Sequence, residues 1–332
     1  MRLPVDCRSV MTLTRTNPRV LFRGHCRNAW RGTTSPIAFA LLAFGTASAA
    51  AHALEESSQS LSSLPWTFEP WEIGSLVFSA VLYGSGLCRV WLRAGIGRGV
   101  RIAQVAAFFL GLLAIVAALV SPLDALSDSL FSAHMVEHEL LMIVAAPLLV
   151  LGRPLAAWVW AIPERLRQSI GGFFHRPGWR RPWLVFTGPL CAWVLHALAL
   201  WLWHVPALFE AALENEGVHA LQHLCFIGTA LLFWWSVLGR ASRRDRGVAL
   251  LSVFTTMVHT GALGALLTLS TVTWYSSYVE TAQAWGLTAL QDQQLGGIIM
   301  WIPAGMVYIV CGLVLSYRWL FGSADNRPLP AH

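Results

Sequence analysis

Residues 134–151 read HMVEHELLMIVAAPLLVL, a composition typical of a membrane-embedded helix. Two histidines four residues apart, His134 and His138, open the stretch, and from Leu140 onward no side chain is charged. A helix that crosses a bilayer needs about 20 predominantly apolar residues. Residues at positions i and i+4 share one face of a helix. The stretch therefore predicts a membrane span that presents two imidazoles on one side of its first turns.

The rest of the chain has the same character, since 56% of its 332 residues are hydrophobic and 12% are charged. Soluble domains carry about 25% charged residues. Six further apolar runs lack the period-2 alternation of barrel strands, and their prolines are tolerated where neighbours satisfy the freed carbonyls. We predict an all-α fold, a polytopic membrane bundle of about seven transmembrane helices in one domain. Besides 134–151, the predicted spans are 71–91, 102–120, 183–203, 218–238, 248–271 and 295–317.

Charge placement predicts the orientation of these spans. The net charge of +6 comes from arginine alone, because the chain contains no lysine. After residue 54, one alternate set of loops and helix ends holds all sixteen arginines, whereas the other set holds none and is rich in acids. Cytoplasmic loops collect positive charge. We therefore expect the mature N-terminus outside, the C-terminus in the cytoplasm and a location in the bacterial inner membrane, with no basic patch left for nucleic acid.

The first 53 residues have the features of a targeting segment. Seven arginines in residues 1–31 precede the apolar stretch 36–45 and the small-residue run 46–53, which contains the cleavage option Ala51-His52-Ala53. A basic region, a short apolar region and an A-x-A site are typical of a signal peptide. We expect residues 1–53 to be a signal peptide or an uncleaved signal anchor, 54–320 the membrane domain and 321–332 a short cytoplasmic tail.

Seven of the eleven histidines gather in the outer half of the predicted bundle. Five lie at the outer ends of spans: His134 and His138 open the third, His204 closes the fourth, and His219 and His223 open the fifth. Two lie deeper: His196 is two turns below His204, and His259 is near the middle of the sixth span.

This pattern predicts a shared metal or proton role at the outer face. Imidazole suits copper, zinc and iron, and a thioether selects Cu(I), so Met142, one turn after His138, is a further candidate ligand. Asp292 and Met300 form a similar stripe on the seventh span, and Glu137 could orient an imidazole. Simpler alternatives remain for these residues: hydrogen bonds between helices for the histidines, packing for the methionines, and a favourable charge at the start of a helix for the acids. Tyr275 and Tyr278 fit interface anchors near span ends.

Four separated blocks of the chain resemble the polytopic CtaG-type cytochrome c oxidase assembly factors over roughly residues 70–320. The blocks are HMVEH with LLMIVAAPLLVLGRP (134–138, 140–154), WHVPALF (203–209), HALQH with FWW (219–223, 233–235) and DQQLGGIIMWIP (292–303). The resemblance implies a membrane factor for assembly of a haem–copper oxidase, which handles copper as Cu(I) and contacts oxidase subunits transiently. The matching positions are His134, His138, His204, His219, His223 and Asp292; His196 and His259 lie outside the blocks.

Other classes stay open at this point. A membrane haem protein would need axial ligands on facing helices, which His196 and His259 could supply. An assembly scaffold without metal would use the histidines for pairing between helices, and seven spans also fit a transporter or receptor. The sequence contains no hydrolytic triad, Walker loop or dinucleotide fingerprint, and we expect no enzymatic activity.

Overall fold

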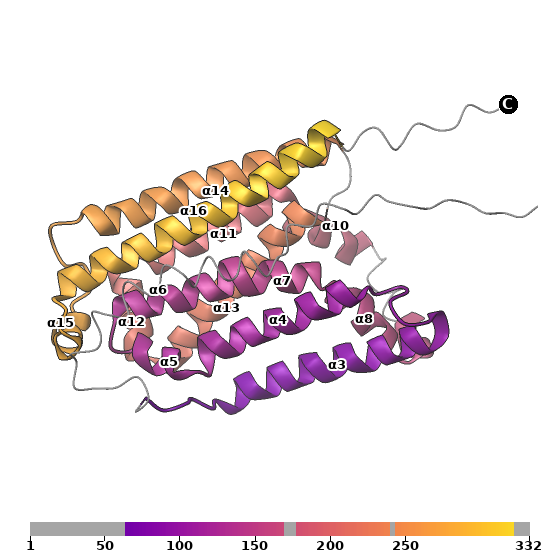
Figure 1. The fold of residues 1–332 in the computed structure, drawn as a ribbon, viewed down its shortest axis with the longest axis horizontal. Coiled ribbons are helices and arrows are strands. Elements are labelled where there is room, and N and C mark those ends of the chain that lie inside the picture. Colours follow the sequence, from indigo (N-terminus) through magenta and orange to yellow (C-terminus); the bar gives the residue numbers. More distant parts are fainter. Residues whose placement is uncertain (1–63, 169–176, 240–242, 322–332) are drawn as a thin grey trace, which may run out of the picture. The chain divides into compact units, whose positions relative to one another are not determined.

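The computed structural model describes residues 64–168, 177–239 and 243–321 (Figure 1). These residues form helices joined by loops, without a strand among them. The predicted targeting segment 1–53 lies outside the described residues, and so does the predicted tail apart from Phe321.

Six of the helices begin at a proline, whose fixed φ and missing N–H suit the first helical position. They are α3 (Pro70–Ala94), α5 (Pro122–Ser127), α8 (Pro154–Ala161), α10 (Pro177–Phe186), α11 (Pro189–Trp203) and α12 (Pro206–Glu214).

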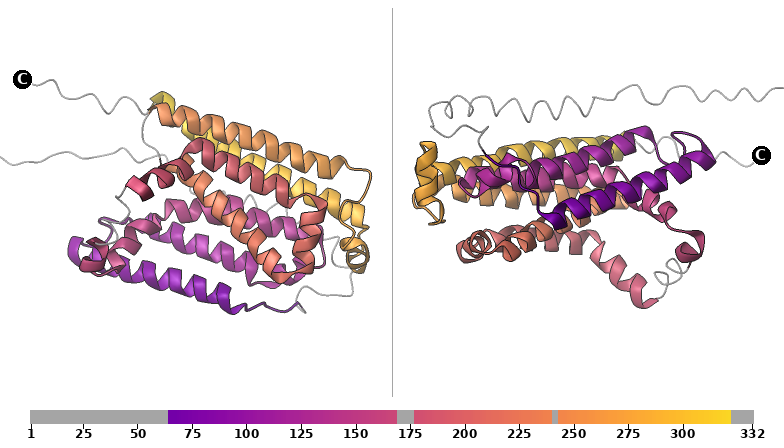
Figure 2. Two further views of the ribbon diagram at one scale, coloured as in Figure 1. Left: turned by 180° about the vertical axis from the view of Figure 1, so that it is seen from behind. Right: turned by 90° about the horizontal axis from the view of Figure 1, so that it is seen from below.

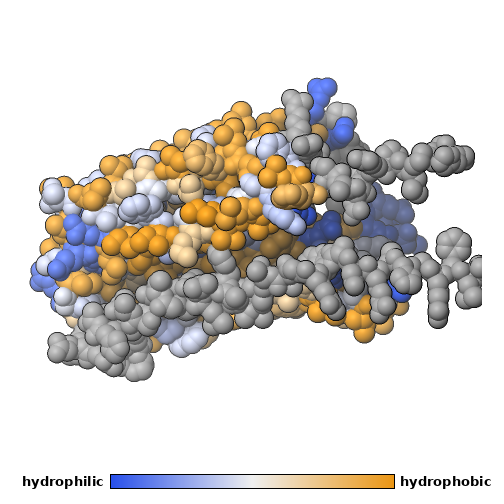
Figure 3. Space-filling view, turned by 45° about the horizontal axis from the view of Figure 1, so that its top comes forward, coloured by the Kyte–Doolittle hydropathy of each residue, from blue (hydrophilic) through white to orange (hydrophobic). Residues whose placement is uncertain are grey.

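Six long apolar segments could each cross a membrane, or seven if one bent helix pair counts as a single span. This agrees with the predicted polytopic all-α bundle. Large apolar side chains such as Phe78 and Leu313 are exposed on the outside of the helices, and Figure 3 shows hydrophobic residues over most of one face, with hydrophilic ones towards its ends. The six are α3, α4 (Ile102–Leu119), the segment Phe131–Leu151, α13 (Glu216–Leu238), α14 (Arg243–Leu269) from Arg246 onward, and α16 (Ala289–Phe321).

The predicted fourth span, 183–203, is not one continuous helix. Its two parts, Gly178–Phe186 and Pro189–Trp203, meet at an angle of 61°. Pro189 has no N–H to continue the ladder of hydrogen bonds. A Cβ on Gly188 would come within 2.9 Å of the Val185 carbonyl oxygen, so this tight bend needs a glycine.

The third span contains a wide turn. It consists of α6 (Phe131–Glu139), the π-helical turn η3 (Leu140–Ala145) and α7 (Ala146–Leu151). Pro147 is the second residue after the π turn, and in a regular α-helix its ring would clash with the carbonyl four residues earlier. The widened turn avoids that clash. The Met142 carbonyl accepts a hydrogen bond from the Trp234 indole at 2.8 Å.

Helices α14 and α16 run side by side in both views of Figure 2. Small residues allow this close approach: a Cβ on Gly297 would lie 2.7 Å from the Gly264 carbonyl oxygen and 2.5 Å from Thr268 Oγ1. Membrane helices commonly pack through such small residues. Gly296, the neighbouring glycine, instead meets Phe131 of α6. The two glycines of the DQQLGG block therefore join α16 to two different helices.

Short helices gather at one end of the bundle, where Figure 1 draws α5, α12 and α15 (Tyr278–Thr281). Helix α15 continues into the 3₁₀ turn η4 (Ala282–Trp285). The loop before it is fixed by side chains of α16: the Gln293 amide oxygen accepts from the Trp274 N–H at 2.6 Å, and the Gln294 amide donates to the Ser270 carbonyl at 3.0 Å. Hydropathy does not predict these short helices, since none is long enough to span a bilayer.

Candidate metal centre

Five of the seven predicted histidines meet at the end of the bundle where α5, α12 and α15 lie. His134 and His138 project from α6, His219 and His223 from α13, and His204 directly follows α11. Within each pair the ring centroids lie 4.3 Å and 4.2 Å apart. Across helices, His134 lies 5.3 Å from His219, and His138 lies 5.6 Å from His223 and 6.3 Å from His204. We call these five residues the histidine cluster.

Most of the cluster is buried without hydrogen-bond partners. His134, His138, His204 and His223 are at most 4% exposed, whereas His219 is partly exposed. Both ring nitrogens of His134 and His138, and Nε2 of the other three, have no partner in hydrogen-bonding geometry. An unpaired buried polar group costs about 1–3 kcal/mol, and native proteins leave few. So many unpaired nitrogens in one place are expected where a bound ion accepts their lone pairs.

The geometry contains two overlapping sets of three ligands. His134, His138 and His223 form one, and His134, Glu137 and His219 form the other; in each set the ligand atoms lie within 4.8 Å of one another. Metal–nitrogen bonds of about 2.0 Å place tetrahedral ligands roughly 3.3 Å apart. Either set can therefore surround one ion after small inward rotations of the rings. His134 belongs to both, so the two sets are alternative positions for one ion.

His204 is held as a neutral imidazole with a defined tautomer. Its Nδ1–H donates to the Leu200 carbonyl at 2.6 Å, which leaves the Nε2 lone pair free. Burial lowers the pKa of His204 to about 4, although the Leu200 hydrogen bond acts in the opposite direction. A metal ligand must be deprotonated, and a backbone carbonyl commonly fixes the tautomer of a ligand histidine. His204 thus has the form that a metal requires at neutral pH.

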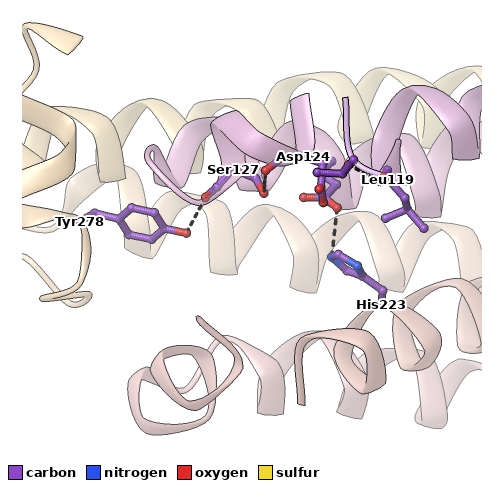
Figure 4. Close-up of polar contacts among 7 residues, drawn as sticks. Leu119, Asp124, Ser127, His223 and Tyr278 are labelled. Atoms are coloured by element: carbon purple, nitrogen blue, oxygen red, sulfur yellow. Dashed lines mark hydrogen bonds and ion pairs between the residues drawn. The ribbon is translucent and has the colours of Figure 1, made fainter. Parts of the chain in front are cut away.

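Glu137, which the sequence predicts as a supporting residue, lies beside the cluster. It is fully buried, and its Oε1 lies 3.3 Å from His223 Nε2. This distance is within ion-pair range, but the angle falls short of a hydrogen bond. Figure 4 shows the contact as a dashed line from His223. Glu137 can therefore either orient His223 or act as a ligand in the set with His134 and His219.

Asp292 supports the cluster by capping the helix that carries His134. Its carboxylate on α16 accepts hydrogen bonds from the Phe131 N–H at 2.6 Å and the Ser132 N–H at 3.0 Å, the first amides of α6. Negative charge at a helix N-terminus also interacts favourably with the helix dipole. Asn215, the residue just before α13, caps its own helix: its side-chain oxygen accepts from the Val218 N–H at 3.1 Å. Both helices with paired histidines therefore begin at a fixed position.

Aromatic side chains cover the cluster at the end of the bundle. Phe131, Phe209, Tyr275 and Tyr278 are each about 1% exposed and pack together. Phe209 lies 4.9 Å from the His134 ring. The Tyr275 hydroxyl donates to the His204 carbonyl at 2.9 Å, and the Tyr278 hydroxyl to the Ser127 carbonyl at 3.1 Å (Figure 4). The interpretation of the two tyrosines as interface anchors is wrong, because both are buried within the protein.

The remaining predicted residues lie outside the histidine cluster. Met300 packs in the same aromatic group as Phe131, and Met142 packs in a hydrophobic group with Phe226. His196 stacks on Phe233 with 5.2 Å between centroids, and its Nδ1 lies 3.3 Å from Thr229 Oγ1. His259 lies edge-on to Trp193 at 5.8 Å, and both its ring nitrogens are buried without a partner.

Sequence reasoning missed several polar residues that the fold brings near the cluster. Gln222 is fully buried on α13, and its position three residues after His219 is the signal that could have identified it. Glu72 of α3 is 8% exposed, and Asp124 of α5 is half-buried. Burial raises the pKa of Asp124 above its usual value. No local pattern connects these two acids with the histidines.

Comparison with known proteins shows which family the chain matches. Residues 81–321 match the family described as cytochrome c oxidase caa3 assembly factor (Caa3_CtaG). Uncharacterised proteins of Mycobacterium bovis and Mycobacterium tuberculosis are 25% identical to the chain over 270 residues, covering 76% of it and 39% of each relative. One from Mycobacterium leprae is 24% identical over 267 residues, covering 76% and 40%. The chain thus spans about two fifths of the length of these relatives. No solved structure matches it.

Proposed function

The chain belongs to the cytochrome c oxidase caa3 assembly factor family, and we propose that it serves oxidase assembly by holding copper, as Cu(I), in the histidine cluster. The observation that carries this proposal is the convergence of five histidines from three segments with their ring nitrogens unpaired. Copper is cargo in this proposal, and the chain itself catalyses no covalent step. Its partners are oxidase subunits that accept the ion and then dissociate.

The charge of the site favours Cu(I) over a divalent ion. The set of His134, His138 and His223 consists of three imidazoles, which bind metals in their neutral form. The cost of burying an ion in a low-dielectric interior rises with the square of its charge. A monovalent ion held by neutral ligands leaves one net charge inside the membrane, whereas zinc would leave two. Imidazole is an accepted ligand type for copper.

An ion that has to be passed on should not be held in a closed cage. The two overlapping ligand sets provide several incomplete sites, with His204 beside them. Exchange among sites of similar affinity keeps an ion available to an acceptor. With the orientation inferred from the arginines, the cluster faces the periplasm of a bacterial inner membrane, and copper would be offered to the oxidase from that side.

Anaerobic loading of the purified full chain with Cu(I) tests the proposal. We expect stoichiometric copper in the wild type, loss of most of it in His134→Ala and His223→Ala, and retention in the control His196→Ala, which removes a histidine outside the cluster. Cells with the first two variants should contain oxidase with less copper. A wild type that binds no copper contradicts the proposal. If the optical spectrum of that wild type shows the sharp reduced bands of haem, the haem alternative replaces copper. If it shows neither copper nor haem while cells that contain it still mature their oxidase, the chain acts as a scaffold.

A further inference from the structure

A row of carboxylates leads from the surface of the bundle to the histidine cluster. Glu69, just before α3, and Asp128, just after α5, are exposed; Asp124 is half-buried and Glu72 is 8% exposed. Glu72 lies close enough to interact electrostatically with Asp124 and Glu69. Glu137 in turn lies close enough to interact with Glu72, Asp124 and Asp128. The row thus ends at the glutamate that contacts His223.

The buried members of this row have unsatisfied oxygen atoms. Glu72 Oε2 and both oxygens of Glu137 are buried without a partner in hydrogen-bonding geometry. Glu137 Oε1 lies 3.3 Å from His223 Nε2, within ion-pair range. Unpaired buried oxygens are costly, and a cation passing along this line would offset that cost.

At the end of the bundle, buried aromatic side chains lie beside His134. The four aromatic rings of Phe131, Phe209, Tyr275 and Tyr278 are buried and lie over it. The carboxylates instead approach the cluster from the side of α3 and α5. Figure 4 shows Asp124 of α5 and His223 of α13 in one small region. The remaining opening is at His219, which is partly exposed.

We propose that Glu69, Glu72, Asp124 and Asp128 form the access route along which a copper ion reaches Glu137 and then the histidines. This inference rests on the proposed copper-binding function and adds the path of the ion. A group of side chains with one sign of charge raises the local concentration of the opposite ion and its association rate. Carboxylate oxygens are hard ligands that hold soft Cu(I) weakly. The ion therefore passes along the row and is retained by the imidazoles.

The test measures the rate of loading separately from the final occupancy. Purified full-length protein is mixed anaerobically with Cu(I) stabilised by acetonitrile, loading is stopped at timed intervals with excess chelator, and protein-bound copper is counted. Glu72→Gln and Asp124→Asn keep the side-chain shape but remove the charge. We expect each to slow loading about three- to tenfold at low ionic strength, within the range of electrostatic steering, with the final copper content unchanged. Added salt should reduce the difference.

Glu214→Gln and Glu280→Gln are the matched controls. Both remove an exposed acid from the same end of the bundle, from α12 and α15, without touching the row. We expect their loading rates to stay within about twofold of the wild type. Equal rates in all four variants would overturn the access route and point to direct entrance at His219, while the copper-binding proposal would stand. An unchanged final copper content also shows that a slow variant is folded.

Discussion

At the scale of single residues, Asp292 shows how far apart in the chain the parts of one site can be. It accepts hydrogen bonds from amides 161 and 160 residues earlier. The sequence predicts Asp292 as a supporting residue, but it cannot say that the support is a helix cap supplied by another helix. The i, i+4 spacing predicts that each pair of histidines shares a face. That the two faces meet becomes evident from the ring distances between α6 and α13.

We expect Asp292→Ala to destabilise the protein by about 1–3 kcal/mol, because two buried amides lose their acceptor. It should also weaken Cu(I) binding, since the start of α6 positions His134. Asp292→Asn keeps one acceptor oxygen and should have an intermediate effect on both quantities. Thermal unfolding in detergent and Cu(I) titration measure them. A fully stable Asp292→Ala variant would show that the cap contributes little.

At the scale of the helices, the apolar runs predict where spans lie but not how they bend. Length and hydropathy locate 183–203, yet the 61° bend follows from Gly188 and Pro189 acting together. A proline in a run is compatible with a continuous helix, since Pro303 lies inside α16. The same ambiguity applies to Pro147, beside which the helix widens into a π turn. Local context in three dimensions decides among these outcomes.

The close contact between α14 and α16 predicts that replacing Gly297 lowers the stability of the protein. Gly297→Ala would place a methyl group against the Gly264 backbone, so the helices must separate. We expect a loss of about 1–3 kcal/mol in stability, as in other overpacked interiors. Gly312→Ala on the same helix is the control, because no atom lies within 4 Å of its Cβ position. Equal melting temperatures for the two variants would contradict this packing.

Glu210 of α12 binds the loop before α15, and its contribution to the stability of the protein depends on pH. Glu210 accepts hydrogen bonds from the Ser276 hydroxyl at 2.6 Å and the Ser276 N–H at 2.8 Å, and these bonds lower the pKa of this partly exposed carboxyl. A carboxyl with a lowered folded-state pKa stabilises the protein above its unfolded pKa, about 4.3, and loses that contribution as the pH falls.

Glu210→Gln should therefore be less stable than the wild type at neutral pH, and the difference should shrink as the carboxyl becomes protonated. Melting curves recorded between neutral and acidic pH measure this change. Glu214→Gln, at the end of the same helix, is the control for the loss of one negative charge. A difference that is independent of pH would refute the role of the carboxylate.

At the scale of the whole molecule, the sequence predicts the class of fold and the number of spans within the observed range. It does not predict which helices are neighbours, because lipid-facing and protein-facing apolar residues have the same hydropathy. For this reason the sequence does not predict the aromatic cover made by Phe209, Tyr275 and Tyr278. Asp124 is brought beside α6 by the packing of α5 on that helix, and Glu72 lies close enough to interact electrostatically with Asp124. No local pattern encodes either placement.

Orientation is a property of the whole chain and is predicted by the arginines. In a cysteine-free background, a membrane-impermeant maleimide added to intact spheroplasts should label Glu280→Cys, beside the histidine end. Arg98→Cys, in the loop after α3, should react only after the membrane is permeabilised. The reverse pattern would place the histidine cluster in the cytoplasm and would exclude delivery of copper from the outer face.

The π turn at Leu140–Ala145 also has an evolutionary consequence. It separates the two histidines of α6 from α7, which packs against α4 and α13. A wide turn absorbs an extra residue and resets the rotation of one helical segment relative to the next. Substitutions in the segment that carries the histidines therefore need not be matched by changes in α7. The third span thus consists of two helical segments joined at the π turn, and each segment can change in sequence without a matching change in the other.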